Sequence, residues 1–102
     1  MPQVRSDAAR TFGERVRAAR TEAGITQLEL AGLAGVHETN ISKLERGESD
    51  PKFSSLIRIA AALEVDPADF VRGIGADQLP PDEPVITRSE LIRALRDQKR
   101  TH

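Results

Sequence analysis

Polar side chains gather on one side of a short predicted helix in the middle of the chain. Within residues 38–46, the apolar residues Ile41 and Leu44 are three positions apart, a spacing that places them on one face of a helix. The polar residues near the start of that helix therefore point outward. Four of them are free to make contacts: Glu38, Thr39, Ser42 and Lys43.

Three of these side chains suit the edges of base pairs. Lys43 can donate to O6 and N7 of guanine, the methyl group of Thr39 can contact that of thymine, and Glu38 can accept from N4 of cytosine. The major groove of DNA admits a helix, and each good contact contributes ~1–3 kcal/mol of discrimination. Glu38 has a second explanation, because an acidic side chain in the first turn also stabilises the helix dipole.

The helix that carries these residues is the second half of a predicted helix-turn-helix over Ala23–Gly47. Apolar residues at helical spacing lie on both sides of a break at Gly35: Leu30, Ala31, Ala34, Val36, Ile41 and Leu44. Gly35 takes a positive φ at little cost, so two short helices can turn sharply there. The hydroxyl of Thr26 can cap the first helix, and Gly47 can close the second.

This segment resembles the Cro/phage-repressor (XRE-type) helix-turn-helix family. The matching residues are Thr26-Gln27, Leu30-Ala31, Gly35-Val36, Ile41-Ser42 and Leu44-Glu45-Arg46-Gly47. The resemblance extends over roughly Thr11–Val71 and implies an all-α, five-helix repressor-like domain that binds DNA. It places Glu38, Thr39 and Lys43 where base-contacting side chains usually lie.

The resemblance also implies a structural ion pair and contacts to the DNA backbone. An arginine at the place of Arg20 pairs in the family with a glutamate at the place of Glu45, and we expect this pair to be partly buried. Gln27 matches a glutamine that contacts phosphate. At a helix N-terminus, the backbone N–H groups and the dipole favour the same anion.

Further residues are candidates for the backbone contacts that fix the register of a protein on DNA. They are Asn40, Arg46 and Lys52. His37 lies where the family often has a serine cap. A protonated His37 can contact phosphate, and a plain surface histidine is the alternative.

The remaining helices of the domain follow from the apolar pattern. A first helix is expected from a cap at Ser6 or Asp7 to about Ala23, after a disordered start over Met1–Ser6. Its inward stripe is Phe12, Val16, Ala19 and Ala23. A helix over about Phe53–Leu63 has its apolar face at Phe53, Leu56, Ile59, Ala60 and Leu63.

A short fifth helix is expected after Asp66, which is a good cap residue, with Phe70 and Val71 closing the core. Leu28 is expected to pack beneath the first helix of the helix-turn-helix. An exposed contact is the alternative for this side chain.

The end of the chain forms a separate region. We divide the chain into a helix-turn-helix domain at 1–73, a linker at 74–86 and a C-terminal helix at 87–102. Thr87 and Glu90 have the spacing of a capping box. The apolar stripe of the helix is narrow, and its main members are Leu91, Ile92 and Leu95. Such a short helix is not stable alone, so it should pack on its own domain, on a second copy or on another protein.

Composition limits the functional classes. The chain has 102 residues, no cysteine and a net charge of −1. Residues 1–20 carry five arginines against two acidic side chains, whereas residues 21–73 carry five basic and nine acidic side chains.

No apolar run approaches the ~20 residues of a membrane span, and no signal peptide is recognisable, so we expect a cytoplasmic protein. No metal-ligand spacing, phosphate loop or nucleophile motif is present, so we expect no enzyme, metal or cofactor.

Two functional hypotheses follow. The first is a sequence-specific transcriptional regulator of double-stranded DNA, a homodimeric repressor that reads a pseudo-palindromic operator. The second is an antitoxin-type interaction module, whose C-terminal tail binds a partner protein while the helix-turn-helix autoregulates.

Overall fold

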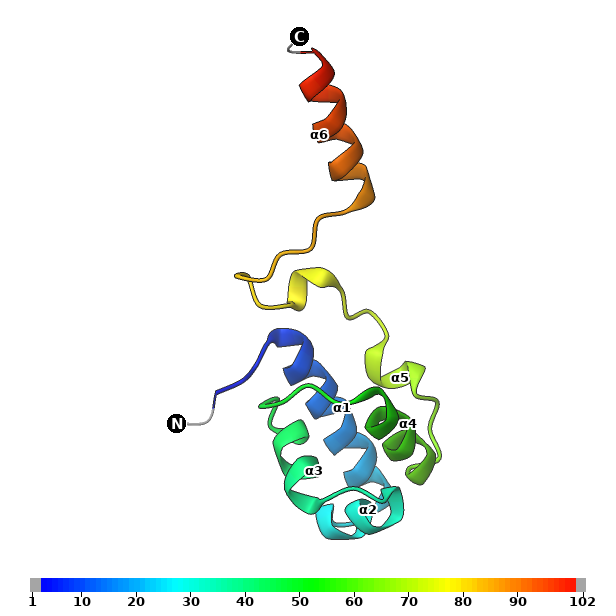
Figure 1. Ribbon diagram of the computed structural model, residues 1–102. Coiled ribbons are helices and arrows are strands. Elements are labelled where there is room, and N and C mark those ends of the chain that lie inside the picture. Colours follow the sequence, from blue (N-terminus) through cyan, green and yellow to red (C-terminus); the bar gives the residue numbers. More distant parts are fainter. Residues whose placement is uncertain (1–2, 101–102) are drawn as a thin grey trace.

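The fold is built around its longest helix, as the computed structural model shows (Figure 1). The structure describes residues 3–100, without the side chain of Arg100. The helices are α1 (Asp7–Ala23), α2 (Gln27–Ala34), α3 (Glu38–Glu45), α4 (Phe53–Ala62), α5 (Ala68–Val71), the 3₁₀ turn η1 (Ala76–Gln78) and α6 (Arg88–Arg100). The described chain is all helical, which confirms the predicted fold class.

Local signals set the helix boundaries. The Ser6 hydroxyl accepts from the N–H of Ala9 and caps α1. At the start of α2, Thr26 and Glu29 form a reciprocal capping box. Gly35 has φ +71° between α2 and α3, and Gly47 has φ +72° after α3. Both turns therefore use the left-handed conformation that glycine adopts at little cost.

The core lies where α1 packs on α3 and α5, and where α2 packs on α3 and α4. The fully buried members with the largest side chains are Leu30, Ile41, Ile59 and Val16. Phe12 of α1 meets Phe70 of α5 edge to face, with ring centroids 5.7 Å apart. This contact closes the bundle at the end of the domain.

Four apolar side chains expected in the core are exposed instead. Phe53 is 80% exposed because it is the first residue of α4, and its side chain leans back beyond the packed turns. Leu28 is 64% exposed because it lies roughly 110° around α2 from the centre of the buried face. Val71 and Ala23 are exposed at the last positions of α5 and α1, past the packed surfaces.

The segment before α1 is held in place, contrary to the expected disorder over Met1–Ser6. The N–H of Arg5 donates to the carbonyl of Gly47 at 2.7 Å, and its guanidinium pairs with Asp50 at 2.7 Å. Met1 and Pro2 lie outside the described residues. The segment therefore runs beside the loop that follows α3.

The C-terminal helix stands apart from the bundle. After η1, the chain extends away from the domain, and α6 projects beyond it (Figure 1). Thr87 caps α6 by accepting from the N–H of Glu90 at 3.1 Å. Every residue from Arg88 to Lys99 is exposed, so the apolar stripe is not covered by the chain's own domain. None of the helices in the described part of the chain has the length and apolar character that crossing a bilayer demands.

Candidate nucleic-acid interface

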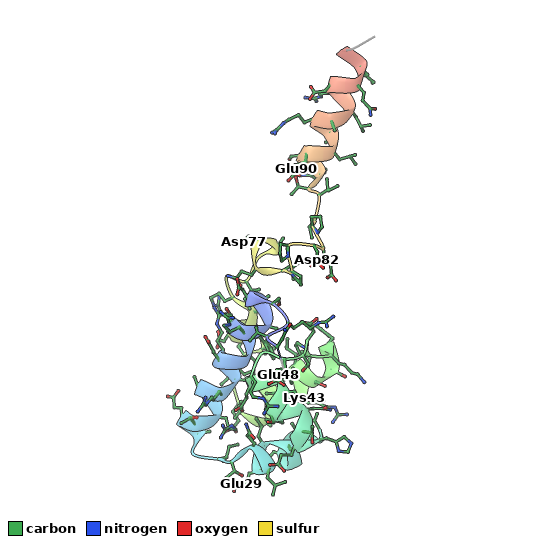
Figure 2. The ribbon with its side chains drawn as sticks, turned by 90° about the vertical axis from the view of Figure 1, so that its left-hand side faces the viewer. Glu29, Lys43, Glu48, Asp77, Asp82 and Glu90 are labelled. Atoms are coloured by element: carbon green, nitrogen blue, oxygen red, sulfur yellow. The ribbon has the colours of Figure 1, made fainter. Side chains whose placement is uncertain are left out.

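The outer face of α3 carries the residues that were predicted to read bases. Ile41 and Leu44 are buried against the core, which turns the rest of this short helix outward. Glu38, Thr39 and Lys43 are exposed, as predicted for residues that contact a partner. In Figure 2, Lys43 lies on the helical bundle, far from the extended α6.

The N-terminus of α3 has no side-chain cap. His37 is the cap residue, and its imidazole makes no capping hydrogen bond. The side chain is exposed beside the exposed Asn40. Lys52 precedes α4 in the same way, with no side-chain cap. These three polar side chains are therefore accessible at the ends of the helices next to the outer face of α3.

A hydrogen-bonded network ties α3 to α1 and α2. Glu45 accepts from Nε of Arg20 at 2.6 Å and from its Nη2 at 2.9 Å. The Glu45 side chain is 3% exposed and that of Arg20 is 15% exposed, so the expected ion pair is present and largely buried. The hydrogen bond to Glu45 raises the pKa of Arg20 above its usual value. Arg20 also donates to the carbonyl of Ile25 at 2.9 Å.

Gln27 joins this network at the start of α2. Its Nε2 donates to Oε1 of Glu45 at 3.0 Å, and the residue is half-buried. The side chain is therefore held at the place where the N-terminus of α2 meets the end of α3. The side-chain amide is oriented by a buried carboxylate. The backbone N–H groups of Gln27 and Leu28 remain as anion donors, whereas that of Glu29 donates to the Thr26 cap.

The C-terminal end of α3 brings two predicted contact residues together. The guanidinium of Arg46 donates to Oγ of Ser42, one turn earlier, and to the carboxylate of Glu48. Ser42 is half-buried, unlike its exposed neighbour Lys43. The hydrogen bond from Arg46 lowers the pKa of Glu48, and the same bond raises the pKa of Arg46.

Two hollows flank α3. One, of about 280 Å³, is lined by Arg17, Arg20, Gln27, Ser42, Glu45 and Arg46. The other, of about 270 Å³, is lined by Asn40, Lys43, Leu44, Ser49, Asp50, Pro51, Lys52 and Ser55. Both offer cationic and hydroxyl or amide donors of the kind that contact DNA phosphates.

Sequence reasoning missed two residues of this surface. Arg17 was not among the predicted contact residues, yet it lines the hollow beside Arg20. Because Arg17 lies three residues before Arg20, both lie on one helical face, and the sequence spacing already indicated this. Glu48 lies beyond the predicted helix, and its contact with Arg46 had no signal in the helical period.

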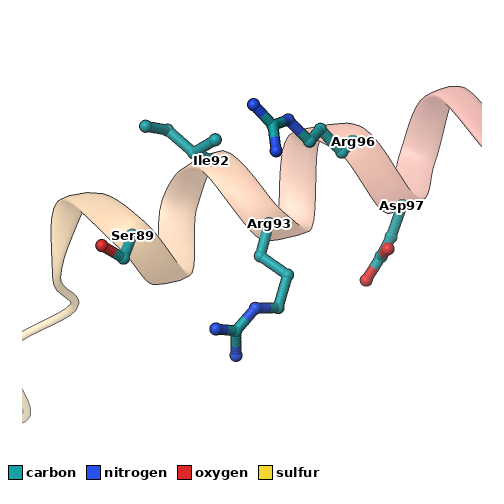
Figure 3. A pocket seen from close by; sticks show the side chains of 5 residues that line it. All are labelled: Ser89, Ile92, Arg93, Arg96 and Asp97. Carbon is teal, nitrogen blue, oxygen red and sulfur yellow. The ribbon is translucent and has the colours of Figure 1, made fainter.

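A larger hollow, of about 360 Å³, lies on α6 and has a different character. It is lined by Ser89, Ile92, Arg93, Arg96 and Asp97, all on α6 (Figure 3). A furrow along one helix has no opposite wall and encloses nothing. The surface around α3, where the predicted contact residues gather beside two hollows, is the candidate site. Within residues 3–100, no group of three histidine or acidic side chains is placed to hold a metal ion.

Fold and site together define a helix-turn-helix protein, and comparison with known proteins agrees. The helix-turn-helix family HTH_3 matches residues 16–70, and the chain belongs to this family. The resemblance to the Cro/phage-repressor type is thereby confirmed. Members of the family are DNA-binding transcriptional regulators rather than enzymes.

Individual relatives match the same domain. Repressor protein C2 of Salmonella phage P22 is 36% identical over 62 residues, which are 61% of this chain and 29% of that protein. The chain spans between 27% and 42% of the length of the first three curated relatives that it matches. The shared region is thus the helix-turn-helix domain.

Solved structures resemble this domain as well. The P22 c2 repressor in complex with a synthetic operator has a TM-score of 0.58 and 35% identity, with 61% of this chain and 94% of that chain covered. The restriction-modification controller protein C.AhdI from Aeromonas hydrophila has a TM-score of 0.60 and 31% identity, with the same coverage.

Proposed function

We propose that this protein is a sequence-specific regulator of transcription that binds double-stranded DNA and reads bases through α3 in the major groove. The observation that carries the proposal is the exposed face formed by Glu38, Thr39 and Lys43 on a helix whose other face is fixed in the core. A rigid helix with polar side chains outward is the element that the major groove accepts. The similarity to a repressor solved with its operator supports the same function.

The backbone contacts are proposed to come from both sides of α3. Gln27 and Arg46 line one hollow, and Asn40 and Lys52 line the other. His37, exposed at the N-terminus of α3, adds a donor when protonated. Contacts of this kind orient the protein without reading sequence, so their loss should weaken binding to all duplexes alike.

Ser42 is proposed as a fourth side chain for base contact, although it differs from the other three. It is half-buried and accepts a hydrogen bond from Arg46. A contact with a base would therefore use the remaining capacity of its hydroxyl, which has one donor and two acceptor sites.

The protein is further proposed to act as a cytoplasmic homodimeric repressor on a pseudo-palindromic operator. One small domain contacts too little DNA for high affinity, and two domains on half-sites about 34 Å apart would supply the rest. The C-terminal helix is the proposed dimer element, because Leu91, Ile92 and Leu95 are all exposed on it. A short isolated helix is marginal in water, so covering this stripe with a second copy would stabilise α6.

DNA reading is tested by selecting duplexes from a random pool and titrating the winner against a shuffled duplex at several salt concentrations. We expect Lys43→Ala to reduce discrimination by the ~1–3 kcal/mol of one base contact. Gln27→Ala should instead weaken both duplexes equally. Equal affinity of the wild type for selected and shuffled duplexes would refute sequence-specific reading.

The dimer is tested by light scattering on the full chain. We expect a dimer for the wild type and a monomer for Leu91→Ser combined with Leu95→Ser. Arg93→Ser is the matched control, since it changes α6 outside the apolar stripe and should leave the dimer intact. A wild-type monomer would instead favour the alternative of an antitoxin-type module, in which α6 binds a partner protein.

A further inference from the structure

The acidic side chain of Glu48 is fixed at the C-terminal end of α3. Its backbone N–H donates to the carbonyl of Lys43 at 3.0 Å, and the preceding Gly47 has φ +72°. A Cβ on Gly47 would lie 2.9 Å from Cα of Arg10, so this turn is packed tightly against α1. The backbone therefore has little freedom, and the carboxylate of Glu48 is held beside the proposed DNA-binding surface.

Glu48 and Arg46 have unequal access to solvent. The side chain of Glu48 is 14% exposed, whereas that of Arg46 is 53% exposed. Nε of Arg46 donates to Oε2 of Glu48, and Nη2 lies 3.4 Å from Oε1. Nη1 donates to Ser42, so the guanidinium folds back along α3 and lies over the helix. Arg46 is thus the more accessible partner, and the carboxylate of Glu48 is the more buried one.

Carboxylates and phosphates are alternative partners for one guanidinium. Both accept its forked N–H groups in the same two-pronged geometry, and arginine stays charged with either. Arg46 lines the hollow that also contains Arg17 and Gln27, where we propose a DNA phosphate to bind. A phosphate that engages the Nε and Nη2 edge of Arg46 has to replace Glu48, which occupies that edge.

We infer that Glu48 is an internal competitor for DNA phosphate, which occupies Arg46 in the free protein and lowers the affinity for every duplex. The inference rests on the proposed function. Because phosphate contacts carry no sequence information, the competition lowers specific and non-specific binding by the same factor. Its consequence is a protein that leaves non-operator DNA readily and depends on base contacts for its residence on an operator.

The test is a double-mutant cycle on DNA affinity with Glu48→Gln, Arg46→Gln and the double variant. We expect Glu48→Gln to bind the selected and the shuffled duplex about three- to tenfold more tightly, with a salt dependence steeper by up to about 0.9. In the Arg46→Gln background, the same change should have no effect. Asp50→Asn is the matched control, because it removes one negative charge from the same loop but pairs with Arg5.

Three results would overturn the inference. Weaker binding of Glu48→Gln would mean that Glu48 positions Arg46 for DNA. A gain that persists without Arg46, or an equal gain in Asp50→Asn, would mean general repulsion of DNA by acidic groups. Retention on heparin distinguishes a failure of this inference from a failure of the proposed function. Later elution of Glu48→Gln, dependent on Arg46, would support the competition even if the wild type preferred no duplex.

Discussion

Removal of the Glu45 carboxylate should expose how strongly the position of α3 depends on α1. Glu45→Ala leaves the charge of Arg20 largely buried without its anionic partner. Breaking a buried pair in this way costs about 3–5 kcal/mol of unfolding free energy. Arg20 is 15% exposed and keeps its hydrogen bond to Ile25, so the loss should fall at the low end, about 3 kcal/mol.

Thermal and urea denaturation followed by circular dichroism measure this loss. For a domain of this size, 3 kcal/mol corresponds to a fall in Tm of roughly 12–24 °C. Glu22→Ala, on an exposed position of α1, is the control and should change stability by less than about 0.5 kcal/mol.

A double variant separates the pair's net contribution from the effect of leaving one charge unpaired. Arg20→Met combined with Glu45→Met replaces both charged groups by apolar side chains of similar volume. Such replacements are often neutral or stabilising, so we expect recovery to within about 1 kcal/mol of the wild type. The reasoning is refuted if Glu45→Ala costs less than about 1 kcal/mol, or if the double variant is no more stable than the single one.

Two further predictions concern the close crossing of helices and the cap of α2. A Cβ on Gly13 would lie 2.1 Å from the carbonyl oxygen of Leu44, so Gly13→Ala should lose about 3 kcal/mol in urea denaturation. Gly32→Ala, with open space around it, should instead gain up to about 1 kcal/mol, and equal losses in both would contradict this packing. The hydrogen bond from the Thr26 N–H is the main cause that lowers the pKa of the Glu29 carboxylate. The ionised carboxylate therefore stabilises the fold at pH values above its ordinary pKa of 4.5, and this stabilisation fades as the pH falls below that value. Wild-type stability should therefore fall more than that of Glu29→Gln in melts between about pH 6 and pH 3, whereas parallel curves would contradict it.

The helices and their boundaries were predictable because their signals are local. Thr26 caps α2 through atoms three residues away, and Gly35 marks a turn that few other residues adopt without strain. The buried face of α3 followed from the spacing of Ile41 and Leu44 alone. Signals of this kind can be recognised in the sequence because each acts within about one helical turn.

The limits of the core were not predictable from the same period. Periodicity tells which face of a helix is apolar, but not how far the neighbouring elements reach along it. Phe53 continues the apolar pattern of α4 and is still exposed, because nothing covers the first turn on that side. Likewise, the contact between Arg46 and Glu48 depends on the turn at Gly47, which no helical spacing describes.

The position of α3 is set by residues that are not expected to touch bases. α3 is too short to be stable alone, so its orientation depends on what lies against it. The backbone of Gly13 fits directly against its last turn, Arg20 binds Glu45 in that turn, and Gly47 packs on Arg10 just beyond it. All three contacts come from α1 and act at the C-terminal end of α3. The N-terminal end, where Glu38 lies, directly follows the turn from α2 and is anchored by the buried Ile41. Small differences in that turn should therefore tune base discrimination, while changes in α1 affect folding first.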